Sequence, residues 1–302
     1  ETVRNISFYG RLSYSYNSRY MLQATIRRDG SSVFGDGHQW GYFPSVSGAW
    51  NVTEEKFMDG LKDALKLSNL KLRVGYGVSG NALGFGAYTA VATYGANGSV
   101  STINGKNYAT LVATKLANPD LKWEKTSMLN IGLDYAFFNG RLNGSIEYYN
   151  KVTKDLIWNY PVTSFLYPFS TISANVGEIT NRGIEISINA IPVQNKNFTW
   201  TTTLNLSHNK NKVNKLTNEK FSTASFTQGD PMVAGVSAEG YTQQIMEGEP
   251  LGTFFTYEFA GYDEDGTSVY YEHDAETGAR TGTTTKAPKF KDRAVTGCAQ
   301  PK

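Results

Sequence analysis

The chain has 302 residues, a formal net charge of +2 and 13% aromatic residues, among them 19 Tyr and 16 Phe. The small net charge implies no strong electrostatic footprint for nucleic acid or acidic lipid. No apolar run approaches the roughly 20 residues of a membrane-spanning helix, and the single cysteine, Cys298, excludes an internal disulfide. The abundance of Tyr, Phe, Thr, Ser, Gly and Asn instead favours many strands joined by polar turns.

The first residues carry no signal peptide, since the chain opens on Glu1 and enters a strand pattern by Ile6. The last residues, 297–302, resemble an interruption rather than an end. We therefore expect a mature form or a piece of a longer cell-envelope protein.

Alternation with a period of two predicts a long strand from Ile6 to Tyr16, because successive strand side chains point to opposite faces. The same alternation predicts about nine strands in all, the others at 20–27, 42–51, 70–76, 129–137, 142–148, 184–189, 198–207 and 251–262. The strands at 42–51 and 251–262 fit the pattern less cleanly. One predicted face is apolar and includes Ile6, Leu12, Leu22, Ile131, Leu133, Ile146, Ile186 and Leu204. The opposite face is polar and includes Arg11, Gln23, Asn130, Glu147 and Asn205.

The connections between these strands alternate in length. Asn17-Ser18, Asn139-Gly140 and the segment 194–197 predict short turns, the second of type I′. Long segments at 30–40, 80–120, 157–176 and 210–250 lie between them. Short turns on one side and long loops on the other are typical of an outer-membrane β-barrel.

One short-side connection, 53–69, predicts a small amphipathic helix with Thr53 as its N-cap and Phe57, Leu61 and Leu65 on one face. The alternative to a barrel is a soluble antiparallel sandwich, whose strands also alternate. Sandwich strands are usually only about 5–6 residues long, and loops of this length are uncommon in compact sandwiches. The pattern therefore favours an all-β, antiparallel transmembrane β-barrel segment.

Few residues suggest chemistry. His38, His208 and His273 lie far apart in sequence with no metal-ligand or triad spacing. The segment Asp263–Gly266 favours a polar turn over a calcium loop, because the closing Glu is missing. The polar-face charges Arg11, Arg73, Asp134, Arg141 and Glu147 are more typical of a solvated barrel wall than of acid–base pairs. We predict no catalytic site, no metal and no cofactor, and hence no enzyme.

The long segments at 80–120 and 157–176 are rich in aromatic residues. Aromatic rings offer flat apolar faces for sugar rings or peptide side chains, and they are also enriched in interface cores. Loop-on-loop packing is the alternative. The predicted substrate or lid contacts are Tyr88, Tyr94, Tyr108, Trp158, Tyr160, Tyr167 and Phe169.

Several motifs along the chain resemble the SusC/RagA family of TonB-dependent transporters. They are Arg27–Gly35 (RRDGSSVFG), Trp40–Trp50 (WGYFPSVSGAW), Leu70–Asn81, Asn118–Glu124 (NPDLKWE), Asn175–Glu185 (NVGEITNRGIE), Gly248–Gly252 (GEPLG) and the closing Ala299–Lys302 (AQPK). No single motif is conclusive, but their order and spacing together are specific.

The resemblance implies a large plugged barrel of about 22 strands in the cell outer membrane. It also implies a SusD-like surface lipoprotein partner, TonB acting through the absent plug region, contact with outer-membrane lipid, and import of glycan or peptide cargo (oligosaccharides or peptides), without nucleic acid as a partner. On this interpretation, residues 1–302 belong to one barrel domain, with the plug and the final strands absent. The alternative function is a non-transporting structural or adhesive surface β-domain.

Overall fold

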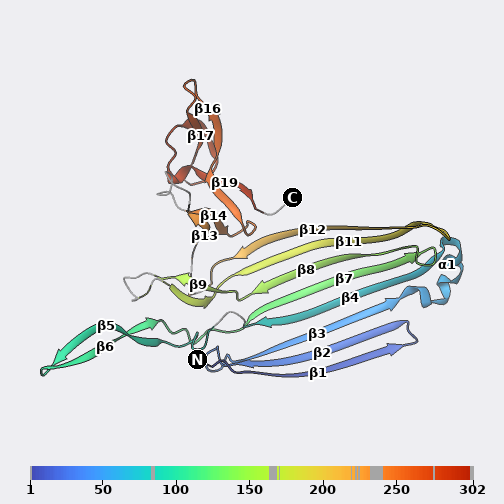
Figure 1. Ribbon diagram of the computed structural model, residues 1–302, viewed down its shortest axis with the longest axis horizontal. Coiled ribbons are helices and arrows are strands. Elements are labelled where there is room, and N and C mark those ends of the chain that lie inside the picture. Colours follow the sequence, from blue (N-terminus) through green and yellow to red (C-terminus); the bar gives the residue numbers. More distant parts are fainter. Residues whose placement is uncertain are drawn as a thin grey trace. The chain divides into compact units, whose positions relative to one another are not determined.

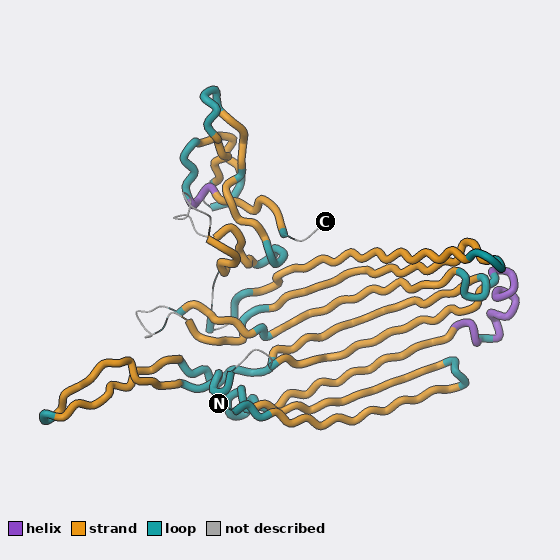
Figure 2. The backbone as a smooth tube through the Cα atoms, viewed as in Figure 1, coloured by secondary structure: helices purple, strands orange, loops and turns teal. Residues whose placement is uncertain are grey.

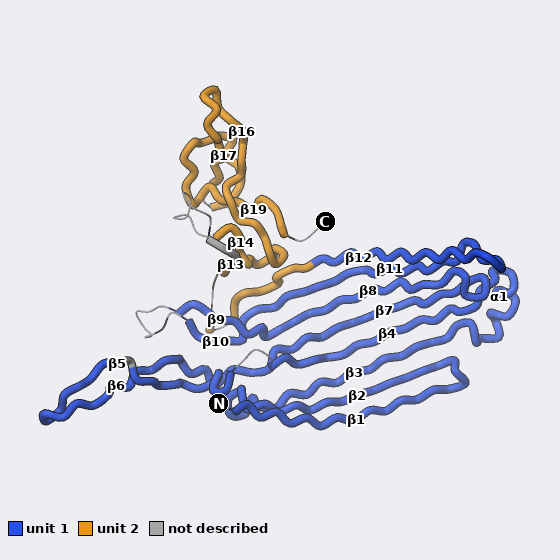
Figure 3. The backbone as a smooth tube through the Cα atoms, viewed as in Figure 1, with its two compact units in different colours: residues 1–210 blue, residues 211–302 orange. Residues whose placement is uncertain are grey.

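A computed structural model describes residues 2–82, 86–162, 169, 171–218, 220–221, 223, 225–231, 241–274 and 276–299. The chain divides into two compact units, residues 1–210 and 211–302 (Figure 3). Nearly all regular structure is β-strand (Figure 2).

An eight-stranded sheet dominates the structure and follows the order β1-β2-β3-β4-β7-β8-β11-β12 (Figure 1). Its strands from β1 to β11 each pair antiparallel with the next. Their bounds are β1 (Asn5–Tyr16), β2 (Tyr20–Ser31), β3 (Trp40–Asn51), β4 (Leu67–Asn81), β7 (Glu124–Phe137), β8 (Leu142–Lys154), β11 (Glu178–Gln194) and β12 (Thr199–Lys215). These eight confirm eight of the nine predicted strands.

The register places the predicted apolar residues on one face. Leu22 pairs with Gly48, Val74 pairs with Ile131, and Tyr148 pairs with Ile184. A second row across the sheet contains Trp50, Leu72, Leu133, Ile146 and Ile186. Many of these side chains are exposed, for example Leu22 at 53% and Ile131 at 45%. This exposed apolar face is what one expects of a sheet that meets a nonaqueous solvent.

The opposite face is polar and carries an ion cluster. Arg73 of β4 donates two hydrogen bonds of 2.8 Å to the carboxylate of Asp134 on β7, and one of 2.6 Å to Glu147 on β8. The guanidinium lies over Gly132, where an added Cβ would come within 2.9 Å of it. The cluster therefore joins three strands on the face where Asn130 and Gln23 also lie, as predicted.

The two ends of the sheet differ as predicted. Short connections and the helix α1 (Asp59–Leu65) gather at one end, and the long connections leave from the other (Figure 1). The turn at Asn139 differs from the two-residue type I′ expectation. Phe137 pairs with Leu142, so four residues form the loop, and φ is positive at Phe138, Asn139 and Gly140.

The predicted helix after β3 is broken into pieces, and Thr53 is not its cap. Two 3₁₀ turns, η1 (Val52–Glu54) and η2 (Lys56–Met58), precede α1, whose N-cap is Met58. Glu55 is extended, with φ −86° and ψ 139°, and its carboxylate accepts hydrogen bonds from Tyr20 and Trp50. These contacts divert the chain where the first helical turn was expected.

The long segments contain strands that alternation did not predict. The hairpin β5 (Thr93–Ile103) and β6 (Lys106–Lys115) extends from the 80–120 segment, and β9 (Ile157–Pro161) pairs with β10 (Thr171–Asn175) in the next. Bulges interrupt the β5–β6 register, so the period-two signal is lost there.

The second unit contains two small antiparallel sheets. One has the order β13 (Ser225–Pro231), β14 (Tyr241–Met246), β15 (Thr253–Tyr257), β19 (Arg293–Cys298), and the other joins β16 (Phe259–Tyr262), β17 (Ser268–His273) and β18 (Arg280–Thr285). A 3₁₀ turn, η4 (Phe290–Asp292), precedes β19. The predicted single strand 251–262 is wrong, because β15 and β16 belong to different sheets. That residues 1–302 form one barrel domain stays a prediction.

Candidate functional site

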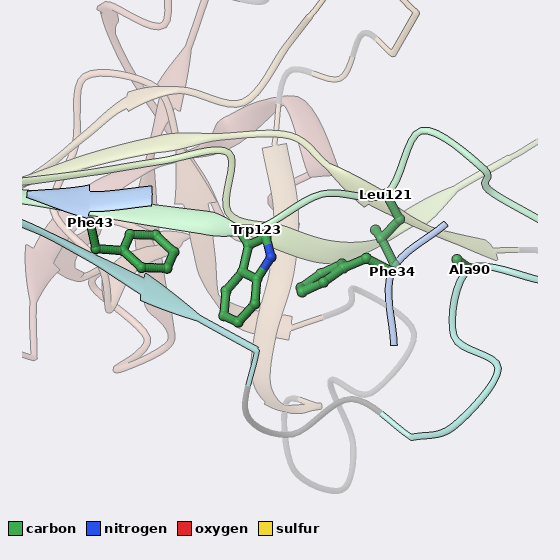
Figure 4. Packing of buried hydrophobic residues seen from close by; sticks show 5 residues of the cluster. All are labelled: Phe34, Phe43, Ala90, Leu121 and Trp123. Carbon is green, nitrogen blue, oxygen red and sulfur yellow. The ribbon is translucent and has the colours of Figure 1, made fainter. Parts of the chain in front are cut away.

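A buried aromatic cluster anchors the long connections at their end of the sheet (Figure 4). The Trp123 ring lies between Phe34 and Phe43, with ring centroids 5.0 Å and 5.4 Å apart. Leu121 is fully buried beside them, and Ala90 joins from the segment before β5. The Trp123 indole N–H donates to the Gln39 carbonyl over 3.0 Å. Three separate connections are therefore fixed against one another.

Two asparagines continue this anchoring toward β9 and β10. The Asn118 amide donates to the Ser173 carbonyl over 2.8 Å. The Asn175 amide donates to the carbonyls of Lys122 and Asp155, both over 2.8 Å, and its oxygen accepts from the Lys122 N–H over 2.9 Å. Short amide side chains of this kind satisfy backbone groups that no strand pairs. The loop surface beyond them is therefore held in place.

Two adjoining hollows lie on this anchored surface. The larger, of about 390 Å³, is lined by Gly86, Thr89, Lys115, Ile157, Trp158, Asn159 and Ser173. The smaller, of about 170 Å³, shares Lys115, Asn159 and Ser173 and adds Phe169 with neighbours from β6 and β10. A volume of about 300–1,000 Å³ is usual for a small-ligand site. The two hollows together form the candidate site.

The shared wall of the hollows is polar. Ser173 lies opposite Asn159 in the β9–β10 register, and its hydroxyl donates to the Asn159 side-chain oxygen over 3.0 Å. The Lys115 ammonium donates to the Tyr88 carbonyl over 3.3 Å. The cation, amide and hydroxyl belong to residues that line the hollows together with Trp158, and such a set can bind a group that has both an apolar face and oxygen atoms.

The structure brings some predicted site residues together and separates others. Trp158, which is 42% exposed, and Phe169 line the adjoining hollows. The backbone carbonyl of Tyr88 accepts the hydrogen bond from Lys115, which lines both hollows. Tyr160 is only 4% exposed, so its ring serves packing rather than contact with a partner. Tyr167 lies outside the described residues.

Tyr94 and Tyr108 lie apart from the hollows on the β5–β6 hairpin. They are 69% and 51% exposed. Tyr94 pairs with Ala113 near the base of the hairpin, whereas Tyr108 pairs with Ser101 near its tip. Five residues of strand separate them, about 17 Å at 3.4 Å per residue. They are available to a large partner but do not share one small-ligand site.

Sequence reasoning missed the polar wall. Lys115, Asn159 and Ser173 come from three strands that the alternation did not predict, so no spacing connected them. Only the β9–β10 pairing brings Asn159 and Ser173 face to face.

The described residues contain no group of three or more His, Cys, Asp or Glu side chains arranged to hold a metal ion. Among the same residues, no helix is both long and apolar enough to cross a membrane.

Long antiparallel strands with one exposed apolar face, one polar face, short turns at one end and long loops at the other define the wall of a transmembrane β-barrel. The family described as "TonB dependent receptor-like, beta-barrel" matches residues 1–291. The chain therefore belongs to the TonB-dependent receptor family, and its relatives place it with the SusC/RagA-like members.

Two relatives illustrate the similarity. TonB-dependent receptor P39 of Formosa agariphila is 39% identical over 261 residues, which cover 85% of this chain and 23% of the relative. TonB-dependent receptor SusC of Bacteroides thetaiotaomicron is 35% identical over 265 residues, covering 87% of this chain and 26% of the relative. The chain thus spans about a quarter of the length of these relatives.

A solved structure shares the fold. The RagAB peptide importer in its "closed-closed" state superposes with a TM-score of 0.78 and 26% identity, covering 96% of this chain and 30% of that one. Its "open-open" state gives 0.79 and 25% identity. The family is one of outer-membrane receptors and transporters rather than enzymes, which favours transport over an adhesive role.

Proposed function

We propose that this chain forms part of the wall and the external loops of an outer-membrane active transporter, energised by TonB, that imports oligosaccharides or peptides. The observation that carries the proposal is the apolar face that continues in register across the sheet while the opposite face is polar. A lipid bilayer outside and a water-filled lumen inside account for both faces. The family match supports the same function.

The loops carry the proposed specificity. Because long loops of such barrels lie outside the cell, the hollows beside Trp158 would meet cargo before it enters the lumen. The Trp158 ring would stack on a sugar ring or an apolar side chain, and Lys115 and Asn159 would bind its oxygen atoms. The exposed rings of Tyr94 and Tyr108 would contact a SusD-like surface lipoprotein that covers the barrel.

The test is cargo uptake by the complete transporter that contains this chain. We expect Trp158→Ala to weaken cargo binding by about fivefold or more, since truncating a hot-spot side chain typically costs over 1 kcal/mol. Phe57→Ala is the matched control, because Phe57 is 63% exposed but lies beside α1 at the opposite end of the sheet. Heat-modifiability on gels reports barrel assembly, and growth on the transported nutrient reports uptake.

Three outcomes distinguish the possibilities. Lost uptake with an assembled barrel in Trp158→Ala, and normal uptake in Phe57→Ala, would support the cargo site. Normal uptake in both variants would remove Trp158 from the cargo site. A barrel that fails to assemble in Trp158→Ala would make the ring structural.

A further inference from the structure

An arginine lies on the apolar face of the sheet without a counter-ion among the described residues. Arg28 of β2 pairs with Phe8 on one side and Tyr42 on the other, so it belongs to the face that carries Ile26 and Leu22. Within the described part of the chain, its side chain contacts aromatic rings: its Cζ lies 4.3 Å from the Trp40 ring centroid and 5.3 Å from that of Tyr42. A guanidinium without an anion on such a face needs an explanation.

The neighbouring arginine shows the contrast. Arg27 points to the polar face, where its Nε lies 2.7 Å from the Asp29 carboxylate. The charge of Arg27 is therefore compensated by a neighbour, whereas no described carboxylate compensates that of Arg28. The near-zero net charge of the whole chain conceals this local difference.

The aromatic rings hold Arg28 in a fixed setting. The Trp40 ring lies flat against Gly30, where an added Cβ would approach its carbons to 2.9 Å, and it stacks on Phe8 at 6.3 Å and 24°. Only a glycine at position 30 leaves room for this placement. The rings are half-exposed to exposed, at 38% for Trp40, 55% for Tyr42 and 61% for Phe8.

A second arginine lines a hollow beside this group. The hollow, of about 150 Å³, is bounded by Arg4, Ile6, Gly30, Ser31, Ser32, Gln39 and Trp40. The backbone of Arg4 is fixed by two hydrogen bonds of 3.0 Å to Ser32, one to its hydroxyl and one from its N–H. Arg4 thus lines a hollow together with Trp40, and Arg28 lies against the ring of the same Trp40.

The height of the group on the sheet identifies what it faces. On β2, Arg28 lies eight residues from Tyr20, which with Trp50 forms an aromatic row at the short-turn end. At 3.4 Å per residue and a strand tilt of 35–45°, this is about 20 Å across a band about 25 Å tall. With the long loops outside the cell, Arg28 therefore lies at the extracellular boundary of the hydrocarbon layer, where lipid headgroups begin and aromatic rings gather.

We propose that Arg28 and Arg4, with the Trp40 ring between them, bind the phosphate of an outer-leaflet lipid headgroup. The planar guanidinium matches phosphate oxygens in a paired geometry, and the apolar rings below accommodate the start of the acyl chain. The inference rests on the membrane placement in the proposed function, and goes beyond it by naming a lipid site outside the transport path.

The experiment uses the complete transporter, purified in a nonionic detergent and mixed with phosphatidylglycerol, phosphatidylcholine or inorganic phosphate. Native mass spectrometry counts the retained lipid. We expect the wild type to retain phosphatidylglycerol over phosphatidylcholine, and Arg28→Gln to lower retention about fivefold, the factor that corresponds to one arginine at an anionic surface. Arg27→Gln is the matched control, because it removes the same charge from the opposite face.

Several results would overturn the proposal. Unchanged retention in Arg28→Gln, an equal loss in Arg27→Gln, or full displacement of lipid by an equal concentration of inorganic phosphate would each exclude a headgroup site. If Arg28→Gln fails to assemble, the comparison of the two lipids on the wild type tests the proposal, because equal retention of phosphatidylglycerol and phosphatidylcholine would also exclude the site. Heat-modifiability measures barrel assembly independently of lipid retention. A wild type that does not assemble as a barrel contradicts the proposed function, whereas an assembled barrel without selective lipid retention contradicts only the lipid site.

Discussion

Single side chains in the family-like motifs serve to pack the loops together. Phe34 comes from the RRDGSSVFG motif, Phe43 from WGYFPSVSGAW, and Leu121 and Trp123 from NPDLKWE. The third motif lies far from the first two in sequence, yet the apolar residues of all three meet in one cluster at the long-loop end. These motifs thus have a shared physical role. Their apolar side chains fix three connections that would otherwise move independently.

Leu121 gives a test of this packing. We expect Leu121→Ala to destabilise the loop cluster by about 2–5 kcal/mol, the usual cost of a leucine-sized cavity, because Leu121 is fully buried. Limited proteolysis of the complete transporter measures it as faster cleavage in the 80–120 segment. Leu111→Ala is the control, since Leu111 is 69% exposed on β6. Equal cleavage rates in both variants would contradict the role given to the cluster.

Glu258 in the second unit gives a pH-dependent prediction. Its carboxylate accepts a hydrogen bond of 2.8 Å from the Arg280 Nε and lies 3.4 Å from the His273 Nε2. The hydrogen bond from Arg280, with the charges of Arg280 and His273, holds the pKa of Glu258 below its usual value. A lowered pKa contributes stability that is complete above the unfolded-state value of about 4.3 and is lost as the pH falls through the folded-state value.

We therefore expect Glu258→Gln to reduce the hydrogen-exchange protection of β16–β18 near neutral pH, and to have no effect once the wild-type carboxylate is protonated. Exchange rates, corrected for their intrinsic pH dependence, measure this in the complete protein. Glu276→Gln provides the comparison, because Glu276 lies exposed in the adjoining turn. A Glu258→Gln effect that persists unchanged at acid pH would refute the assignment.

At the scale of the strand, the two faces predict opposite tolerances. Ile131 and Asn130 are neighbours near the middle of β7 and point to the apolar and the polar face, respectively. We expect Ile131→Arg to cost about 2–4 kcal/mol, as for a charge near the bilayer midplane, and to block assembly of the complete transporter. Asn130→Arg should assemble normally. Equal heat-modifiability of the two variants would show that the faces are misassigned.

The strands of the large sheet were predictable because one rule governs them. Each has a face in contact with apolar surroundings and a face in contact with polar ones, so period two persists along the strand, as from Ile6 to Tyr16. The rule fails where both faces meet similar surroundings. In the β5–β6 hairpin, Tyr94 and Tyr108 are both exposed, and bulges in the register shift the alternation further.

The site was predictable in part for a related reason. Composition marked Trp158 and Phe169, because aromatic residues in a polar loop are conspicuous in a sequence. It could not mark Asn159 and Ser173, which are ordinary loop residues until the β9–β10 pairing sets them opposite each other. Nor could it separate buried Tyr160 from exposed Trp158, because burial depends on contacts that exist only in the folded chain.

At the scale of the whole molecule, the outer part of the β5–β6 hairpin can be removed without changing the eight-stranded sheet. Replacing residues 97–110 with an Asn-Gly turn would join Ala96 to its partner Leu111. We expect normal barrel assembly, since the eight-stranded sheet does not include β5 or β6. Co-purification of the proposed lipoprotein partner should fall, because the variant loses Tyr108. Unaltered co-purification would exclude Tyr108 and the outer part of the hairpin from the lid contact, whereas Tyr94 is retained in this variant.

The Arg73 cluster has a consequence for the strand register, and through it for the radius of the barrel. In a closed barrel the stagger between strands, the shear, sets the radius together with the strand number. A one-residue slip between β4 and β7 is opposed by the hydrophobic pattern, because it turns every side chain to the wrong face. A two-residue slip keeps each face correct, and the pattern does not oppose it.

The ion cluster opposes the two-residue slip. A two-residue slip that pairs Arg73 with Asn130 moves Asp134 about 7 Å further along the strand from Arg73, whereas a slip of the opposite sense pairs Arg73 with Asp134 itself. Either slip replaces Gly132 beneath the guanidinium with a residue that has a side chain. Because Glu147 on β8 shares the same guanidinium, the stagger of three strands is checked at one point. Three charged residues and a glycine thus select one shear among those that the apolar pattern permits.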